Sequence, residues 1–167
     1  QAYEYAGRAY LMDLKTGKST VMADPDAERL AEVNFGKTQP WKFTASDGTE
    51  IDGMMCLPPD FDPNKKYPLI VYYYGGTSPS QRGMSHAYIP QLFASRDYVV
   101  YILNPSGTTG YGQEFSARHV NAWGKRTADE IIEGVKKFCE EHPYVDSKKI
   151  GCLGASYGGF MTMYLQT

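Results

Sequence analysis

The sequence predicts an α/β protein whose core is a parallel β-sheet. Three continuous apolar segments are rich in β-branched and aromatic residues, as strands buried on both faces of a sheet are: 69–74, 98–103 and 149–154. Patterns typical of helices lie between these segments and after the last one: about 88–96, 127–142 and from 157 onward. Because a strand, a helix and a parallel strand form the usual crossover unit, this alternation favours the α/β class.

The helix predicted at 127–142 has the clearest boundaries. Thr127 is expected to cap it, with Glu130 completing a Thr-x-x-Glu capping box, and His142-Pro143 is expected to end it. Its buried stripe is expected to consist of Ile131, Ile132, Val135, Phe138 and Cys139. In the shorter helix near 88–96, the residues expected on one side are Ile89, Leu92 and Phe93.

Two hairpins are predicted before the first of these strands. Each consists of two β-favouring segments around a turn with glycine: 9–14 with 19–22, and 41–45 with 50–57. A hairpin without partner strands is only marginally stable in water. The first hairpin is therefore expected to be the edge of another structure, and residues 24–40 are expected to connect it to the α/β part.

The composition excludes several classes of function. The chain has 167 residues, enough for one ordinary core, and its net charge of −2 offers no basic surface for nucleic acid or an anionic membrane. No apolar run is long enough to span a bilayer. Cys56, Cys139 and Cys152 are odd in number and far apart, so we expect buried thiols and neither a disulfide framework nor a zinc site. No metal or organic cofactor is implied.

One motif has the residue types and the context of a catalytic nucleophile. Gly154-x-Ser156-x-Gly158 lies between a predicted strand and a predicted helix, where a nucleophile elbow lies in serine hydrolases. The sharp turn crowds the serine against its neighbours, so small residues are expected at both glycine positions. The helix N-terminus then stabilises negative charge beside the hydroxyl. The alternative interpretation is a Gly-rich turn that lets the helix pack closely on the strand.

Acyl transfer also needs hydrogen-bond donors aimed at the oxyanion. The backbone N–H of Tyr157, which follows the serine, is one candidate by the construction of the elbow. Tyr74 ends an earlier strand just before Gly75-Gly76, and its hydroxyl is the candidate for the second donor. The alternative for Tyr74 is an aromatic side chain packed at the end of a strand.

Other conspicuous residues point to structural roles. Gly107-x-x-Gly110-x-Gly112 follows a strand, but its spacing reverses the dinucleotide fingerprint, so we expect a structural loop near the active site. In hydrolases with this elbow, the base follows the serine in the chain. The three histidines, His86, His119 and His142, all precede Ser156 and are therefore expected at the surface or in packing contacts.

Together the motifs resemble the prolyl oligopeptidase family of serine peptidases, in particular the branch with dipeptidyl peptidase IV and the acylaminoacyl peptidases. The matching segments occur in order over roughly residues 40–167: Ser46-Asp47-Gly48-Thr49 before a strand ending in Pro58, Tyr67-Pro68-Leu69-Ile70-Val71, Tyr74-Gly75-Gly76, Gly107-x-x-Gly110-Tyr111-Gly112, Trp123-Gly124, Val145-Asp146-x-x-x-Ile150 and Gly154-x-Ser156-Tyr157-Gly158-Gly159-Phe160. The joint match is far more specific than any single segment.

The resemblance implies roles for three residues. Ser156 is implied as the nucleophile, and the Tyr157 N–H and the Tyr74 hydroxyl as the oxyanion donors. Acylaminoacyl peptidases usually have His-Gly-Gly-Pro where this chain has Tyr74, so the tyrosine favours the dipeptidyl peptidase branch. The chain departs from the family pattern at Ser106, where many relatives have arginine, and at Thr77, where a proline commonly follows the glycines.

The resemblance also implies a domain organisation. Residues 1–37 are expected to be the end of a β-propeller and a linker, and residues 38–167 the N-terminal part of an α/β-hydrolase domain that is incomplete at its C-terminus. No Asp, Glu or His follows Ser156, so the chain alone is expected to be catalytically incompetent. It is expected to associate with itself or with the rest of the enzyme.

The implied substrate is a peptide, from which dipeptides ending in Pro or Ala are released from the N-terminus. The alternatives left open are an acylaminoacyl peptidase, a carboxylesterase of the same fold, and a non-catalytic fragment that acts only as a scaffold.

Overall fold

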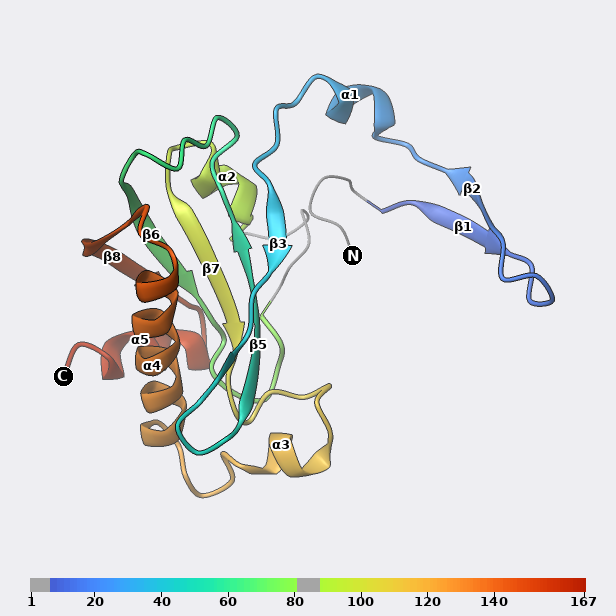
Figure 1. The fold of residues 1–167 in the computed structure, drawn as a ribbon. Coiled ribbons are helices and arrows are strands. Elements are labelled where there is room, and N and C mark those ends of the chain that lie inside the picture. The colour runs from blue at the N-terminus through green and yellow to red at the C-terminus, as the bar shows by residue number, and fades with distance from the viewer. Residues whose placement is uncertain (1–6, 81–87) are drawn as a thin grey trace.

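The computed structural model describes residues 7–80 and 88–167, and its main body is a mixed six-stranded sheet with helices on both faces (Figure 1). The strands of the sheet, in spatial order, are β3 (Thr38–Pro40), β5 (Glu50–Cys56), β7 (Val99–Asn104), β6 (Tyr67–Tyr72) and β8 (Val145–Leu153), and β4 (Phe43–Thr44) pairs with β5. The helices are α1 (Ala27–Ala31), α2 (Pro90–Ala94), α3 (Gln113–Ala117), α4 (Lys125–Glu141) and α5 (Tyr157–Tyr164). No helix among the described residues is long and apolar enough to cross a membrane.

The predicted parallel core is confirmed, and an antiparallel hairpin extends it. β6 pairs in parallel with β7 on one side and with β8 on the other. β5 joins the far edge of β7 in antiparallel orientation, and β3 and β4 pair antiparallel with β5. The second predicted hairpin therefore exists as β4 and β5, and its long strand is part of the main sheet.

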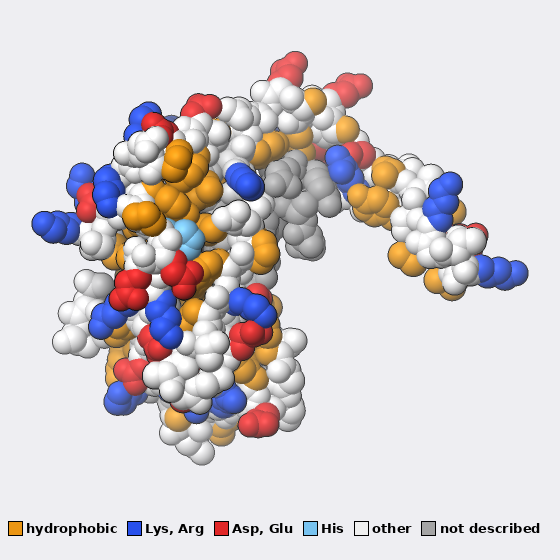
Figure 2. Space-filling view, in the orientation of Figure 1, with side chains coloured by type: hydrophobic (Ala, Val, Ile, Leu, Met, Phe, Trp, Pro, Cys, Tyr) orange, Lys and Arg blue, Asp and Glu red, His pale blue; other side chains and the backbone are white. Residues whose placement is uncertain are grey.

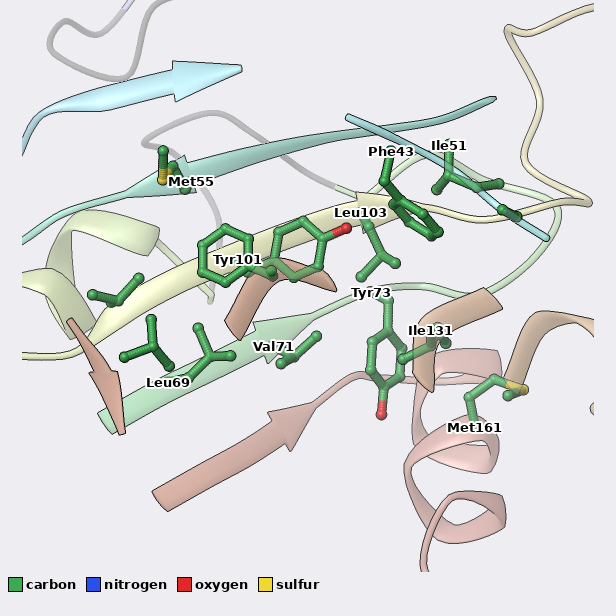
Figure 3. Close-up of a cluster of buried hydrophobic side chains, with 14 of the residues drawn as sticks. Phe43, Ile51, Met55, Leu69, Val71, Tyr73, Tyr101, Leu103, Ile131 and Met161 are labelled. Atoms are coloured by element: carbon green, nitrogen blue, oxygen red, sulfur yellow. The ribbon is translucent and has the colours of Figure 1, made fainter. Parts of the chain in front are cut away.

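The centre of the sheet is β7, whose six residues are all buried. Val99, Tyr101 and Leu103 face a core that is closed by α4 and α5 (Figure 3). Val100 and Ile102 point to the opposite face, where they pack with Ala94 of α2. Because successive side chains of a strand alternate between its faces, a continuous apolar run suits a strand covered on both sides.

The predicted start of α4 is wrong. The helix begins at Lys125 with Gly124 as its N-cap residue, so Thr127 lies inside the first turn and no capping box forms. Thr127 and Glu130 are buried and contact Ser106, because both side chains face the loop after β7. The predicted stripe holds at Ile131 and Phe138, whereas Ile132 is exposed. In α2 the buried residues are Pro90, Gln91 and Ala94, and Leu92 is exposed, contrary to its predicted side.

β8 is an edge strand, which corrects the prediction of a third strand buried on both faces. Among the described residues it pairs only with β6, and most of its residues are exposed, Ile150 included. Its second half, Ile150-Gly151-Cys152-Leu153, has the composition of an interior strand, but within residues 7–80 and 88–167 no strand lies on its other side.

The first predicted hairpin forms β1 (Ala9–Met12) and β2 (Ser19–Ala23), which pair with each other and project from the main body (Figure 1). All residues of both strands are exposed, including large apolar ones, which Figure 2 shows as hydrophobic patches along the hairpin. The exposed large hydrophobic residues there are Tyr10, Leu11, Met12, Leu14, Val21 and Met22. The hairpin therefore forms without burying an apolar face of its own.

The three cysteines are free thiols. Cys56 is buried, as expected, whereas Cys139 and Cys152 are half-buried. Burial raises the pKa of the Cys139 thiol, with a further contribution from the charge of Glu140. Cys139 is therefore held in its protonated, weakly nucleophilic form.

Candidate active site

The carboxyl ends of β6 and β8 bring two predicted site segments together. Tyr72 and Leu153, the last residues of these neighbouring parallel strands, are register partners. Tyr74 follows two residues after the end of β6, and Ser156 follows three residues after the end of β8. Because parallel strands end at the same edge of a sheet, both residues emerge at one edge.

Ser156 occupies a strained turn between β8 and α5. Its backbone angles are φ 55° and ψ −118°, and its side chain is exposed. A positive φ is uncommon for a residue with a side chain and costs about 1–3 kcal/mol, which the surrounding structure must supply. This is the strand–turn–helix geometry of a nucleophile elbow.

The two glycines of the motif are required by close backbone contacts. A Cβ atom on Gly154 would lie 2.6 Å from the backbone of Gly158, and a Cβ atom on Gly158 would lie 2.7 Å from the carbonyl oxygen of Tyr73. Backbone atoms cannot move aside as a flexible side chain can, so the predicted need for small residues is confirmed. Gly159 differs, because a Cβ there would meet its nearest atom at 3.6 Å, an ordinary contact.

The structure places the side chain of Tyr74 beside the serine. The Tyr74 hydroxyl donates to Ser156 Oγ at 3.3 Å, which is long for a hydrogen bond between two hydroxyl groups. Tyr157 is the first residue of α5, so its N–H belongs to the free amides of the helix N-terminus. The three predicted site residues therefore lie together at one edge of the sheet.

The side chain of Tyr157 contacts the segment before α4, which the sequence did not reveal. Its hydroxyl accepts a hydrogen bond from the Gly124 N–H at 3.2 Å, and its ring packs edge-on against Trp123. A Cβ on Gly76 would lie 3.0 Å from the same ring. The side chain of Tyr157 therefore ties the start of α4 to the glycines that follow Tyr74. The Trp123-Gly124 pair, which the sequence analysis matched to the family, was the sequence signal for this contact.

The Gly107–Gly112 loop lies against the Tyr74 segment, as expected for a structural loop near the site. Thr77 and Thr108 form a β-bridge, and the Thr109 N–H donates to the Thr77 carbonyl at 3.3 Å. Thr77 has φ 37°, a value that proline cannot adopt because its ring holds φ near −65°. A proline at this position would therefore need a different local path of the backbone.

Ser106, in the loop after β7, lies among charged side chains from other parts of the chain. The Ser106 N–H and hydroxyl each donate to the Glu130 carboxylate at 2.7 Å, and Glu130 is only 4% exposed. Arg118 donates to Ser106 Oγ at 3.4 Å, and Arg126 lies 3.4 Å from Glu130. Two cations, Arg118 and Arg126, therefore lie beside the Ser106–Glu130 contact, and the sequence did not single them out.

The described histidines have packing contacts. His119 pairs its Nδ1 with the Ser116 carbonyl at 2.8 Å and lies against Gly107, while the buried His142 pairs its Nδ1 with the Phe138 carbonyl at 2.7 Å. Both results confirm the predicted packing role. His86 lies outside the described residues.

The geometry can be compared with known proteins. The sequence profile of the prolyl oligopeptidase family matches residues 84–167. The chain is 37% identical over 125 residues to dipeptidyl-peptidase 5 of Schizosaccharomyces pombe, covering 74% of this chain and 18% of that protein. It is 33% identical over 168 residues to dipeptidyl-peptidase 5 of Porphyromonas gingivalis, covering 98% of this chain and 24% of that protein. The chain thus spans about a fifth of the length of the curated relatives it matches.

Solved structures give the same relationship. An acylaminoacyl peptidase of Pyrococcus horikoshii superposes with a TM-score of 0.81 at 28% identity, covering 93% of this chain and 24% of that one. Dipeptidyl peptidase 4 of Porphyromonas gingivalis gives a TM-score of 0.80 at 27% identity, covering 98% of this chain and 24% of that one. The mixed sheet has the α/β-hydrolase fold of these peptidases. With the elbow, the family profile and the structural likeness in agreement, the chain belongs to the prolyl oligopeptidase family of serine peptidases.

Proposed function

We propose that Ser156 is the nucleophile of a serine peptidase and that Tyr74 and Tyr157 bind the oxyanion. The observation that carries the proposal is the contact of 3.3 Å between the Tyr74 hydroxyl and Ser156 Oγ. It places a donor beside the nucleophile on the strained elbow, with the free Tyr157 N–H adjoining. Packing at a strand end would not require the hydroxyl of Tyr74 to reach this serine.

The proposed reaction begins with attack by Ser156 Oγ on a peptide carbonyl carbon. The carbonyl oxygen becomes an oxyanion, which accepts hydrogen bonds from the Tyr74 hydroxyl and the Tyr157 N–H. A general base takes the serine proton and passes it to the nitrogen of the breaking C–N bond, so the amine leaves neutral, and a water activated by the same base then hydrolyses the acyl-enzyme. Before substrate binds, the Tyr74 hydroxyl donates to Ser156 Oγ at 3.3 Å, and catalytic hydrogen bonds are often long in this state. In the full-length enzyme, the base and its carboxylate are proposed to come from outside residues 1–167.

The proposed substrates are peptides with a free N-terminus, from which dipeptides ending in Pro or Ala are released. Tyr74 supports this preference, since acylaminoacyl peptidases of the family that this chain resembles usually have histidine at the position of Tyr74. The relatives named dipeptidyl-peptidase 5 support it as well. The second candidate is acylaminoacyl peptidase activity, which the likeness to the Pyrococcus horikoshii structure favours.

The proposed domain division supports a peptidase of this kind. Residues 1–37 are proposed to be the end of a β-propeller with its linker, because the exposed apolar side chains of β1 and β2 suit a strand pair that packs in a larger sheet assembly. Residues 38–167, which begin at β3, are proposed to form the N-terminal part of the hydrolase domain.

Active-site labelling of the full-length protein tests the nucleophile. A fluorophosphonate probe should label the protein, and Ser156→Ala should abolish the labelling. Ser78→Ala, at an exposed serine near Tyr74, is the matched control and should leave labelling unchanged. Labelling that persists in Ser156→Ala would refute the assignment.

A substrate pair separates the two candidate activities. The proposal expects a higher kcat/KM for a glycyl-prolyl chromogenic amide than for an N-acetyl-alanyl amide. The reverse preference would assign the protein to the acylaminoacyl peptidases.

A further inference from the structure

The Tyr74 backbone is held by a buried serine in its own loop. β6 ends at Tyr72, so the Tyr74 N–H lies beyond the ladder that pairs β6 with its neighbours. This N–H donates instead to Ser80 Oγ at 3.0 Å, and the Ser80 hydroxyl donates to the Leu103 carbonyl at 3.1 Å. One hydroxyl group thus ties the residue that carries the proposed oxyanion donor to the end of the central strand.

Ser80 is fixed in turn by Asn104, the last residue of β7. The Ser80 N–H donates to Asn104 Oδ1 at 2.7 Å. The Asn104 amide group donates to the Tyr111 hydroxyl at 2.9 Å, and that hydroxyl donates to Asp52 Oδ2 of β5 at 2.6 Å. Every donor in this series faces an acceptor, so the side-chain amide of Asn104 can take only one orientation.

The burial of this pair makes its hydrogen bonds specific. Ser80 is 4% exposed and Asn104 is 1% exposed. Water cannot readily replace a lost partner at such positions, so removal of one hydroxyl leaves a polar group unsatisfied. The two residues therefore specify one backbone position for Tyr74, whereas an exposed loop serine would leave several available.

We propose that Ser80, itself held by Asn104, is a positioning residue that aims the Tyr74 hydroxyl at the oxyanion site. This inference rests on the proposed role of Tyr74. The side chain of Tyr74 spans from its tethered backbone to Ser156 Oγ, so a shift of the backbone moves the hydroxyl with it. A misplacement of about 1 Å in a catalytic group can cost about a hundredfold in rate. The elbow packs on the same backbone, because a Cβ on Gly158 would lie 3.3 Å from the Tyr74 carbonyl oxygen.

A double-mutant cycle in the full-length protein tests the proposal, with Ser80→Ala, Tyr74→Phe and their combination. Ser80→Ala should lower kcat about tenfold with KM nearly unchanged, the pattern of an interaction needed only in the transition state. In the Tyr74→Phe background the same change should lower kcat by less than about twofold, because the hydroxyl that Ser80 aims is absent. Ser78→Ala is the matched control and should retain wild-type kcat.

A peptidyl boronic acid gives a second measurement, because its tetrahedral adduct with a serine mimics the oxyanion intermediate. Ser80→Ala should weaken its inhibition about tenfold, with the melting temperature showing that each variant is folded. An unchanged kcat, or an equal loss in both backgrounds of the cycle, would overturn the positioning role. If that happens while Ser156→Ala is inactive, only this inference fails. Activity that persists in Ser156→Ala would refute the proposed function and this inference with it.

Discussion

The two segments that meet at Ser156 are held in place by different physical means. The elbow is shaped by close steric contacts, since Gly154 packs against the Gly158 backbone and Gly158 packs against the Tyr73 carbonyl oxygen, and neither leaves room for a side chain. The Tyr74 segment is instead positioned by hydrogen bonds to Ser80 and, through it, to Leu103 and Asn104 of a different strand. The small residues that the elbow requires can be recognised from the local Gly-x-Ser-x-Gly spacing, whereas the hydrogen bonds of the Tyr74 segment join distant residues that no local pattern links.

This difference explains how each segment should respond to substitution. Where backbone atoms are in close contact, an added methyl group forces the backbone to move, and the atoms packed against it move as well. In a hydrogen-bonded arrangement, each substitution removes one hydrogen bond and leaves the others in place, so the effect of each substitution is smaller. Substitutions that add or remove a single group can therefore distinguish the two.

The largest effect is expected from Gly158→Ala. Its new Cβ would lie 2.7 Å from the Tyr73 carbonyl oxygen, so the elbow must move away from the Tyr74 segment. We expect turnover to fall by about a hundredfold or more, because the nucleophile and the oxyanion donor are displaced relative to each other. Turnover and thermal unfolding of the full-length protein are the measurements.

Gly159→Ala is the matched control for this prediction. It lies in the same helix, and its Cβ would make only an ordinary contact at 3.6 Å. Since alanine is favoured over glycine in a helix by up to about 1 kcal/mol, Gly159→Ala should be neutral or slightly stabilising. Equal losses of turnover in both variants would show that crowding at Gly158 does not shape the elbow.

The next largest effect is expected from Tyr74→Phe. Loss of one oxyanion donor costs about 2.7–4 kcal/mol of transition-state stabilisation, which corresponds to a rate reduction of about a hundred- to a thousandfold. Single-turnover measurement of acylation should show this loss with the melting temperature nearly unchanged. Tyr144→Phe, which removes a hydroxyl that contacts Met55 Sδ, should leave acylation at the wild-type rate. If Tyr74→Phe acylates as fast as the wild type, Tyr74 has only a packing role.

The same contrast shows how much the sequence could predict. The parallel order of β6, β7 and β8 and the elbow at Ser156 follow from local patterns of apolar residues and glycines, and the structure has them. The burial of β8 could not be predicted from its composition, because burial depends on a neighbour beyond its free edge. The contact of Ser80 with Asn104 could not be predicted either, since it joins residues 24 positions apart, one after β6 and one at the end of β7.

The start of α4 shows a third limit. Thr127 and Glu130 have the spacing of a capping box, and that spacing is also compatible with a helix that begins earlier. Tertiary contacts favour the earlier start, because the side chains of Thr127 and Glu130 bind Ser106 in the loop after β7. A local motif was overridden by polar groups that needed partners in the interior.

A third prediction concerns this buried contact, whose effect should be on stability more than on chemistry. Glu130→Gln replaces an oxygen that accepts from Ser106 with an amide group that can only donate, so a donor faces a donor. We expect a loss of about 2–3 kcal/mol in the free energy of unfolding, in the range for hydrogen bonds to buried charged groups. Asp129→Asn is the control on the same helix, since its ion pair with Lys125 is exposed and should contribute less than about 1 kcal/mol. Similar losses in the free energy of unfolding of both variants would contradict a larger contribution from the buried Glu130 contact.

The smallest effect is expected at the turn between β4 and β5, where Asp47 provides a pH-dependent contribution to stability. Hydrogen bonds from Thr49 lower the pKa of Asp47 below its ordinary value of 3.8, and the nearby charge of Arg126 lowers it further. A carboxyl group with a lowered pKa in the folded state stabilises the fold above its ordinary pKa, and this contribution is lost as the pH falls through the folded value. The Asp47 side chain is 48% exposed, so solvent screening keeps the contribution below about 1 kcal/mol.

Asp47→Asn should therefore be slightly less stable than the wild type at pH 7, and the difference in the free energy of unfolding between the two should close as the pH falls below about 4. The same gap should narrow in 1 M salt at pH 7, because the pair with Arg126 is exposed. Urea unfolding from pH 7 to pH 2.5 measures the difference, and a gap that stays constant over this range would show that the charge of Asp47 does not stabilise the turn.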